Sequence, residues 1–369
     1  MNGSVSLQDP ADEEYSMDTY TSDSSDSDHS GRVVDLAYRL LDVTAIDQHL
    51  DQYFDNKKRF IEIESIMLRH NRLSSIPENV SRFSNLKTLD LSNNMLKTLP
   101  DILQFCPLVT LIVKHNFLTN DSLPKSFARK NTLKELNLSG NQLTEFPEQI
   151  CDLVNLRYLY LGGNKMSTIS RNIYKLTNIQ VLYLGGNEIV EVPPVLGQLK
   201  TLQALALCEN KIETLPFNIA DLHGLKSLQL HKNRLRVLPP EIVALKNLSE
   251  LSLRENPLVV QFISEMSNNP PSLLELAARV VKLYDIPVAD GDLPRTLHKY
   301  LETANHCVNP KCKGVYFDNR VEHIKFVDFC GKYRLPLLHY LCSVKCRKTT
   351  KEEVPEPSRS YMMKKVLLG

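Results

Sequence analysis

Residues 133–141 read LKELNLSGN, and residues 156–164, which begin 23 positions later, read LRYLYLGGN. The same frame, L-x-x-L-x-L-x-x-N, returns at 86–94 as LKTLDLSNN and at 225–233 as LKSLQLHKN. Its asparagine recurs at intervals of 22 to 25 residues, at the nine positions Asn71, Asn94, Asn116, Asn141, Asn164, Asn187, Asn210, Asn233 and Asn256. This period indicates a stacked repeat, because one such unit is too small to bury its own apolar face.

The frame is that of the leucine-rich repeat family, which the chain resembles over residues 60–262. Of its 58 leucines, 40 lie between Leu68 and Leu258. The expected fold is an α/β solenoid of nine repeats of about 23 residues, in which each L-x-L core forms a short parallel strand. The repeated asparagine is expected to bond backbone groups in the turn that follows each strand.

Composition excludes several classes of protein. The 44 basic and 43 acidic side chains leave a net charge of +1, which argues against binding driven by phosphate neutralisation. No apolar run approaches the length of about 18 residues that a membrane span needs, and the N-terminus lacks the pattern of a secretory signal. We therefore expect a soluble protein of the cytoplasm, or also of the nucleus, without nucleic-acid or membrane partners.

The two ends of the chain differ from the repeats. Residues 1–31 contain eight acidic residues and no Lys or Arg, which predicts a disordered acidic tail, or alternatively a phosphorylated docking tail. Residues 32–59 have helical apolar spacing from Val33 to Phe54, so we expect a helical cap over the first repeat. Residues 348–369 are charged and contain proline, and we expect them to form a mobile tail.

Side chains between the inward leucines should line the concave face of the sheet. Tyrosines surrounded by basic side chains are typical of protein-binding surfaces. Gly162, Gly163, Gly185 and Gly186 in the adjacent turns are expected to leave a bare floor around these tyrosines. The predicted patch would bind a folded protein with an acidic element, although the tyrosines could instead only shield the strands. It consists of Met67, Ile112, Tyr158, Tyr160, Tyr183, His231, Arg234 and Arg254.

Residues 270–303 do not continue the repeat. Ser272 and Glu275 form an S-x-x-E capping box, which marks the start of a helix. Apolar residues then recur at helical spacing from Leu273 to Val281, and a second short helix is expected after Leu293 and Pro294. From the residues alone, this segment could simply cap the end of the solenoid.

The segment also resembles the suppressor-of-cytokine-signalling box, the helical module through which substrate receptors join cullin ubiquitin ligases. This resemblance implies that elongin C, paired with elongin B, would bind Ser272, Leu273, Leu276, Ala277, Val280 and Val281. It implies that a cullin would bind Leu293, Pro294, Leu297, Tyr300 and Leu301. Ala277 replaces the commoner cysteine, and Thr296 stands where a second proline is usual, so the choice between cullin-5 and cullin-2 stays open.

Five of the eight cysteines lie within residues 304–347, the expected Cys-rich unit. Disulfides are disfavoured in an intracellular chain, and paired C-x4-C and C-x3-C spacings are typical of zinc ligands. We predict a structural zinc site formed by Cys307, Cys312, Cys342 and Cys346. The alternative is a set of ordinary buried cysteines in a small aromatic unit, and we expect Cys330 to pack without binding metal.

The C-terminal stretches PPSLLELAAR and CVNPKCKGVYFD resemble one group of intracellular leucine-rich repeat proteins. That resemblance implies a non-catalytic substrate-recognition subunit of an elongin BC–cullin RING ubiquitin ligase. We find no nucleophile with a positioned base and no phosphate-binding glycine loop, so no enzyme activity is expected. The alternative is a signalling scaffold that binds a GTPase or a phosphatase through the repeats alone.

Overall fold

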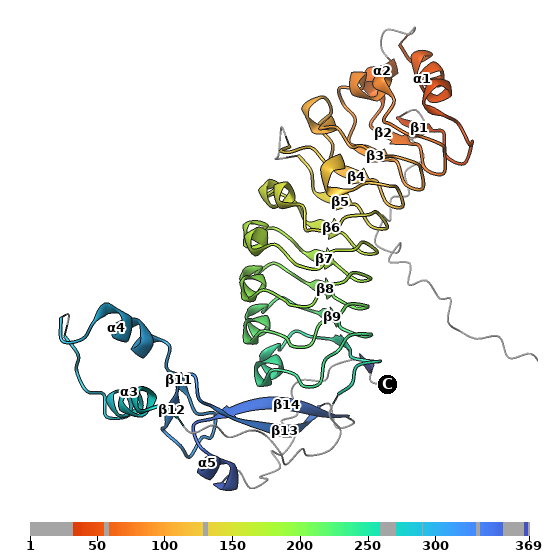
Figure 1. The fold of residues 1–369 in the computed structure, drawn as a ribbon. Coiled ribbons are helices and arrows are strands. Elements are labelled where there is room, and N and C mark those ends of the chain that lie inside the picture. The colour runs from red at the N-terminus through yellow and green to blue at the C-terminus, as the bar shows by residue number, and fades with distance from the viewer. Residues whose placement is uncertain are drawn as a thin grey trace, which may run out of the picture.

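The computed structural model describes residues 32–54, 59–127, 132–258, 271–289, 291–329, 333–349 and 365–367. Figure 1 shows a curved stack of repeats, with a smaller C-terminal unit of helices and strands at its far end. The described stack contains one parallel sheet of eleven strands, which follow one another in the order of the chain except for the last. These strands are β1 (Val33–Asp35), β2 (Ser65–Met67), β3 (Thr88–Asp90), β4 (Thr110–Ile112), β5 (Glu135–Asn137), β6 (Tyr158–Tyr160), β7 (Val181–Tyr183), β8 (Ala204–Ala206), β9 (Ser227–Gln229), β10 (Glu250–Ser252) and β15 (Lys365–Leu367).

Each repeat strand places its central side chain in the core. In β6, Leu159 is fully buried while Tyr158 and Tyr160 are half-buried on the opposite face. The strands pair in register, so Leu159 lies beside Leu136 of β5 and Leu182 of β7. Short 3-10 turns form the other side of the stack, at Glu78–Arg82, Ile102–Gln104, Asn120–Ser122, Glu148–Asp152, Arg171–Lys175, Pro194–Gln198, Phe217–Asp221 and Pro240–Ala244.

The repeated asparagine ties each repeat to its neighbours. Asn164 is buried, and its amide donates to the carbonyls of Leu138 (3.1 Å) and Leu161 (3.0 Å). Its side-chain oxygen accepts a hydrogen bond from the backbone amide of Leu143 at 3.1 Å. A buried backbone group without a partner is costly, which explains why this position keeps an amide side chain. The predicted leucine-rich repeat solenoid is confirmed, and strands β2 to β10 precede the nine asparagines.

The N-terminal cap contains a strand that was not predicted from the sequence. Val33–Asp35, expected to be helical, pair with β2 as β1, so the prediction of a helical cap is wrong there. The side-chain amide of Asn71 donates to the carbonyl of Leu36 at 2.8 Å. Asn94 donates in the same way to the carbonyl of Leu68, one repeat later. Residues 33–41 are therefore a divergent first repeat, hidden because Arg39 stands where the asparagine is expected.

Helices cover this first repeat. Helix α1 (Val43–Asp51) begins at Asp42, whose side chain caps it, and buries Ile46 and Leu50. Helix α2 (Arg59–Glu62) follows. The predicted acidic tail, residues 1–31, lies outside the described residues.

At the other end, the open edge of β10 is covered by β15, which pairs with it in parallel. The prediction that residues 348–369 are a mobile tail is wrong for Lys365–Leu367, and helix α5 (Val344–Thr349) also crosses the predicted boundary. The predicted end of the repeats at residue 262 lies outside the described residues.

The C-terminal unit contains helices α3 (Leu273–Leu283) and α4 (Arg295–Glu302), and strands β11 (Asn305–His306), β12 (Val315–Tyr316), β13 (Val321–Phe329) and β14 (Tyr333–Leu341). The antiparallel β13–β14 hairpin, rather than α3, closes the solenoid core: Leu335 and Leu337 are buried within it. Leu238 of the last repeats exchanges backbone hydrogen bonds with β14, at 2.9 Å to Pro336 and 2.9 Å from Leu338. Among the described residues, no helix is long and apolar enough to cross a membrane.

Candidate functional site

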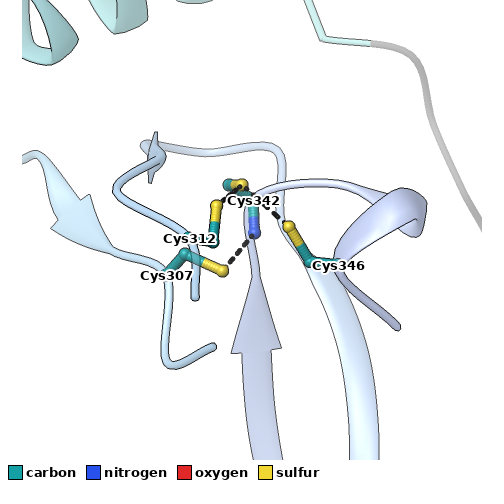
Figure 2. A group of neighbouring side chains, drawn as sticks. All are labelled: Cys307, Cys312, Cys342 and Cys346. Carbon is teal, nitrogen blue, oxygen red and sulfur yellow. Dashed lines mark hydrogen bonds between the residues drawn. The ribbon is translucent and has the colours of Figure 1, made fainter. Parts of the chain in front are cut away.

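The four cysteines predicted to bind zinc come together in the C-terminal unit (Figure 2). Cys307 and Cys312 lie between β11 and β12, Cys342 directly follows β14, and Cys346 lies in α5. All four sulfur atoms lie within 4.8 Å of one another. The Sγ of Cys342 is 3.5 Å from that of Cys312 and 3.6 Å from that of Cys346. Zn–S bonds of about 2.3 Å in a tetrahedron place sulfur atoms about 3.8 Å apart, so the observed cluster fits this ion.

Backbone amides donate to two of the four sulfur atoms, while burial raises the pKa of Cys342 and Cys346. The backbone amide of Gly314 donates to the Sγ of Cys312 at 3.2 Å, and the amide of Cys342 donates to the Sγ of Cys307 at 3.5 Å. Burial acts to raise the pKa of Cys312, but the Gly314 amide and the neighbouring thiols lower it below its ordinary value. Four protein ligands would leave no open position on the metal, which suits a structural site. Cys330 lies outside the described residues.

Helix α3 exposes a stripe of apolar side chains. Leu273 is 85% exposed, and Leu276, Val280 and Leu283 are each 44–48% exposed. Their spacing places them along one side of the helix. Ala277 is also exposed, whereas Val281 is half-buried against the core of the C-terminal unit. A helix that served only to cap the solenoid would bury this stripe, whereas α3 leaves it exposed.

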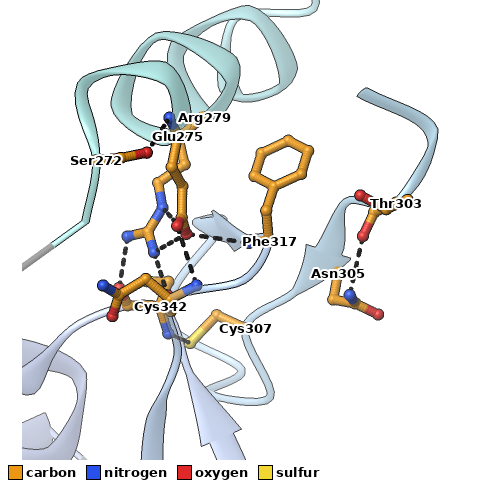
Figure 3. A network of polar contacts seen from close by, with 9 residues as sticks. Ser272, Glu275, Arg279, Thr303, Asn305, Cys307, Phe317 and Cys342 are labelled. Carbon is orange, nitrogen blue, oxygen red and sulfur yellow. Dashed lines mark hydrogen bonds and ion pairs between the residues drawn. The ribbon is translucent and has the colours of Figure 1, made fainter. Parts of the chain in front are cut away.

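The opposite side of α3 is held by a buried ion pair (Figure 3). Glu275, only 2% exposed, accepts hydrogen bonds from the amides of Phe317 (3.2 Å) and Asn319 (2.9 Å) and from Arg279. Arg279 in turn donates to the carbonyl of Cys342 at 2.7 Å and to the carbonyl of Asn319. This network connects α3 directly to the backbone of a cluster cysteine. It therefore fixes which side of the helix faces outward.

The predicted cullin-binding residues are divided between the core and the surface. Leu301 is buried, and the ring of Tyr300 stacks on Phe317 with centroids 4.8 Å apart. Leu293 packs against the same small core. Pro294 is exposed and Leu297 is half-buried. Tyr300 and Leu301 thus hold α4 on the unit. Leu301 is buried and Tyr300 is half-buried, so the most exposed of the predicted cullin-binding residues is Pro294.

On the concave face, three of the predicted tyrosines lie side by side. Tyr160 pairs in register with Tyr183, and the hydroxyl of Tyr158 donates to Gln180 at 3.3 Å. Burial raises the pKa of both Tyr160 and Tyr183 to about 12, so both hydroxyls are protonated and able to donate hydrogen bonds at neutral pH. These tyrosines present polar groups on partly buried rings, as protein-binding surfaces commonly do.

The expected bare glycine floor is not present at Gly162 and Gly185, whereas Gly163 is exposed and Gly186 is half-buried. A side chain on Gly162 would collide with the ring of Tyr183, 2.2 Å from the nearest ring atom, and one on Gly185 would collide with Cys208. Both glycines are buried, because the neighbouring side chains lie over them. Their absence of side chains makes room for Tyr183 instead of exposing backbone.

The remaining predicted patch residues do not gather around the tyrosines. Met67 on β2 lies four strands from Tyr160 on β6, about 19 Å along the sheet. Ile112 is half-buried on β4, and Arg234 and Arg254 are exposed at the far end. His231 contacts Ser252 at 3.2 Å, and burial lowers its pKa, so it is a poor cation at neutral pH.

A small hollow beside the tyrosines was not predicted from the sequence. It is lined by Tyr183, Ala206 and Gln229, together with their strand neighbours. The signal was present in the sequence as Ala204 and Ala206, two small residues where other repeats carry larger ones.

Comparison with known proteins identifies the repeats. A family model described as "Leucine rich repeat" matches residues 106–166, 177–235 and 200–258, and a second model of the same description matches residues 85–106. A protein of Xenopus laevis named leucine-rich repeat-containing protein 58 is 50% identical over 123 residues, which are 31% of this chain and 35% of that protein. The human protein of the same name is 61% identical over 87 residues, 24% of each.

The match therefore spans about a third or less of these curated relatives. Among solved structures, a leucine-rich repeat protein of Leptospira interrogans is 32% identical and aligns over 55% of this chain and 58% of that chain, with a TM-score of 0.44.

Proposed function

Because this chain is a leucine-rich repeat protein, its function depends on what its surfaces bind, and we propose that it is the substrate-recognition subunit of an elongin BC–cullin RING ubiquitin ligase. The exposed apolar stripe of α3 carries this proposal. The concave face would hold a protein substrate, α3 would bind elongin C, and the turn at Pro294 would contact cullin-5 or cullin-2. The chain itself would take no part in the chemistry.

The stripe has the form of a helix that docks in a groove. Leu273, Leu276 and Val280 recur at intervals of three and four residues, which presents one continuous apolar edge. Burying one leucine side chain contributes about 1.5–3 kcal/mol, so three or four such residues are enough to anchor a partner. Ala277 is exposed between them, in the position where the related module carries a small side chain.

The proposed ligase role also requires two separate binding surfaces, and the concave face and the stripe of α3 are separate. The concave face belongs to the solenoid, while α3 belongs to the C-terminal unit beyond β10 (Figure 1). A receptor must hold the substrate at one site and the ligase at another. Tethering in this way raises the effective concentration of substrate lysines near the charged conjugating enzyme.

Charge reversal on the stripe tests the proposal. Leu273→Asp should abolish capture of purified elongin B–C while the chain stays folded, because the native side chain is 85% exposed. Val243→Asp is the matched control, since Val243 is an exposed apolar residue on a solenoid turn. Equal capture by wild type and Leu273→Asp would refute elongin docking. A wild type that binds no elongin at all would favour the alternative, a scaffold that binds a GTPase or phosphatase through its repeats.

We further propose that the four-cysteine cluster binds one structural zinc ion. The supporting observations are the sulfur distances and the two amide-to-sulfur hydrogen bonds. Metal analysis of the purified chain should give about one zinc per chain, and less than roughly 0.2 would reject the site. Cys346→Ser should lose the metal, whereas Cys151→Ser, a buried cysteine of the solenoid, should retain it.

For the substrate surface, the double variant Tyr158→Ala/Tyr160→Ala should lose capture of the substrate and keep elongin binding. The reason is that both tyrosines lie on β6, far along the chain from α3. Quantitative proteomics of ligase-dependent turnover would compare this variant with wild type. Substrates of the ligase should be stabilised by Leu273→Asp, which blocks elongin docking. If the double tyrosine variant degrades all of these proteins at the wild-type rate, the tyrosines do not bind the substrate.

A further inference from the structure

The turns that follow β1 to β4 form a surface unlike the rest of the solenoid edge. We call it the N-terminal rim and define it as residues 37–40, 69–72, 92–95 and 114–117. Tyr38, His70, Asn93 and His115 all have φ between 54° and 60°, so the four turns share one backbone conformation. Because the strands before them pair in register, equivalent side chains form columns with a spacing of about 4.8 Å.

The N-terminal rim exposes apolar and aromatic side chains. Tyr38 is 65% exposed and Leu40 63% exposed, while Met95 and Phe117 are 49% and 48% exposed. The ring of Tyr38 stacks on that of His70 with centroids 4.3 Å apart. In the next five repeats the position of Met95 and Phe117 is taken by polar residues, Gln142 and Lys165 among them. The apolar surface is therefore confined to the first turns.

The charge of the rim is also one-sided. It contains Arg39, Arg69, Arg72 and Lys114 and no acidic residue of its own, and Arg69 pairs with Asp90 at the end of β3 at 3.6 Å. The equivalent turns near the other end of the stack are balanced by ion pairs, Lys211 with Glu188 at 2.7 Å and Lys232 with Glu209 at 2.8 Å. A basic surface with exposed aromatic side chains suits an acidic, extended segment.

The chain itself carries such a segment. Residues 1–31 contain eight acidic residues and no Lys or Arg, and they also include Tyr15, Met17 and Tyr20. They join the fold at Arg32, directly before β1, and β1 leads into the first turn of the rim. A flexible chain of this length has a root-mean-square reach of about 30 Å, while four turns span only about 15 Å. Tethering gives an effective concentration on the order of millimolar, so even weak contacts would be populated.

We propose that the acidic segment of residues 1–31 docks on the N-terminal rim of the same chain. The docking joins carboxylates to the arginine and lysine side chains and places apolar residues of the segment against Tyr38 and Phe117. The seven-residue run SDSSDSD would gain charge by serine phosphorylation, which strengthens the contact. A docked segment would also compete with any acidic partner for this end of the sheet. This proposal does not depend on the ligase role.

Zero-length carbodiimide cross-linking of the full chain, followed by peptide mapping, tests it. Carboxylates of residues 1–31 should link to Lys114 within one chain, with a yield independent of protein concentration. High salt should suppress the link, because exposed ion pairs are screened. Arg72→Glu should lower the yield about fivefold or more while leaving the reacting amine intact. Arg234→Glu, an exposed arginine at the equivalent position of a later repeat, is the matched control and should leave the yield unchanged.

Three outcomes would overturn the proposal. The first is an absence of links between residues 1–31 and Lys114. The second is a yield that Arg72→Glu and Arg234→Glu reduce equally, which would indicate nonspecific attraction. The third is linkage found only in covalent dimers, which would assign the occupant of the rim to a second copy of the chain. Circular dichroism of each variant would verify that the solenoid remains folded.

Discussion

Replacing Glu275 with alanine should release helix α3 from the C-terminal unit. The carboxylate is 2% exposed and accepts hydrogen bonds from Phe317 and Asn319 as well as from Arg279. Alanine removes all of these contacts and adds no replacement. Arg279 keeps its bond to the carbonyl of Cys342, but its charge loses its partner.

The size of the effect follows from the burial of the pair. Each buried amide left without an acceptor costs about 1–3 kcal/mol, and removing one member of a buried ion pair costs about 3–5 kcal/mol. These contributions overlap, because the same carboxylate serves both roles. We expect the attachment of α3 to the C-terminal unit to lose about 3–5 kcal/mol of stability. The lower limit corresponds to a rise of roughly 150-fold in the equilibrium constant for local opening of α3.

Hydrogen–deuterium exchange read by mass spectrometry measures this opening locally. Peptides that cover α3 and residues 315–319 should exchange about 100-fold faster or more in Glu275→Ala, while solenoid peptides stay protected. Glu302→Ala, at the exposed end of α4, is the matched control. Elongin B–C capture should weaken in parallel, since the apolar stripe would no longer be held outward.

An acceleration of less than about threefold at residues 315–319 would refute the reasoning, because the ion pair would then contribute little to holding α3. Equal acceleration in the solenoid peptides would also contradict it, by showing that the variant destabilises the whole chain. A normal exchange pattern with lost elongin capture would mean that Glu275 acts in some other way.

Two further predictions concern stability. Asn164→Ala should lower the free energy of unfolding of the solenoid by about 2–3 kcal/mol in urea, since it leaves a buried amide and carbonyls unpaired, whereas the exposed Asn178→Ala should cost less than about 1 kcal/mol. Burial, aided by nearby Lys325, lowers the pKa of His339 to about 4, below its unfolded value of about 6.5. The unfolded chain therefore binds more protons between these values, and stability falls as the pH drops from about 6.5 towards 4. At pH 5 the loss relative to pH 7 should be about 2 kcal/mol, and His339→Phe should remove it in paired urea titrations.

Several features followed from short-range patterns in the sequence. The asparagine period predicted the strands because each repeat contacts mainly its neighbours, so the same burial requirement recurs every turn of the stack. The capping residue Ser272 marked the start of α3, and its side chain accepts from the amide of Glu275 at 3.1 Å. The spacing of Cys307, Cys312, Cys342 and Cys346 predicted their cluster, because each close pair lies in one short connection, β11 to β12 or β14 into α5.

Other features depended on contacts between distant parts of the chain. The strand at Val33–Asp35 had no asparagine to mark it, and it is recognisable only through its pairing with β2. Tyr300 matched a cullin-binding motif, yet it stacks on Phe317, a neighbour that the local sequence does not specify. Likewise, nothing in the sequence around Gly162 indicated that the ring of Tyr183 from the next repeat covers it.

The sequence by itself thus determined the solenoid, the position of α3 and the choice of four cysteines. Only the tertiary structure decided which surface of α3 faces outward, because that depends on Glu275 meeting amides 42 and 44 residues away. The same holds for the end of the solenoid, where Leu335 and Leu337 of β14, rather than α3, complete the core. Burial that recurs with a fixed period can be predicted from residues close together in the chain. A contact between two distant segments depends on the residues of both segments, so neither segment predicts it alone.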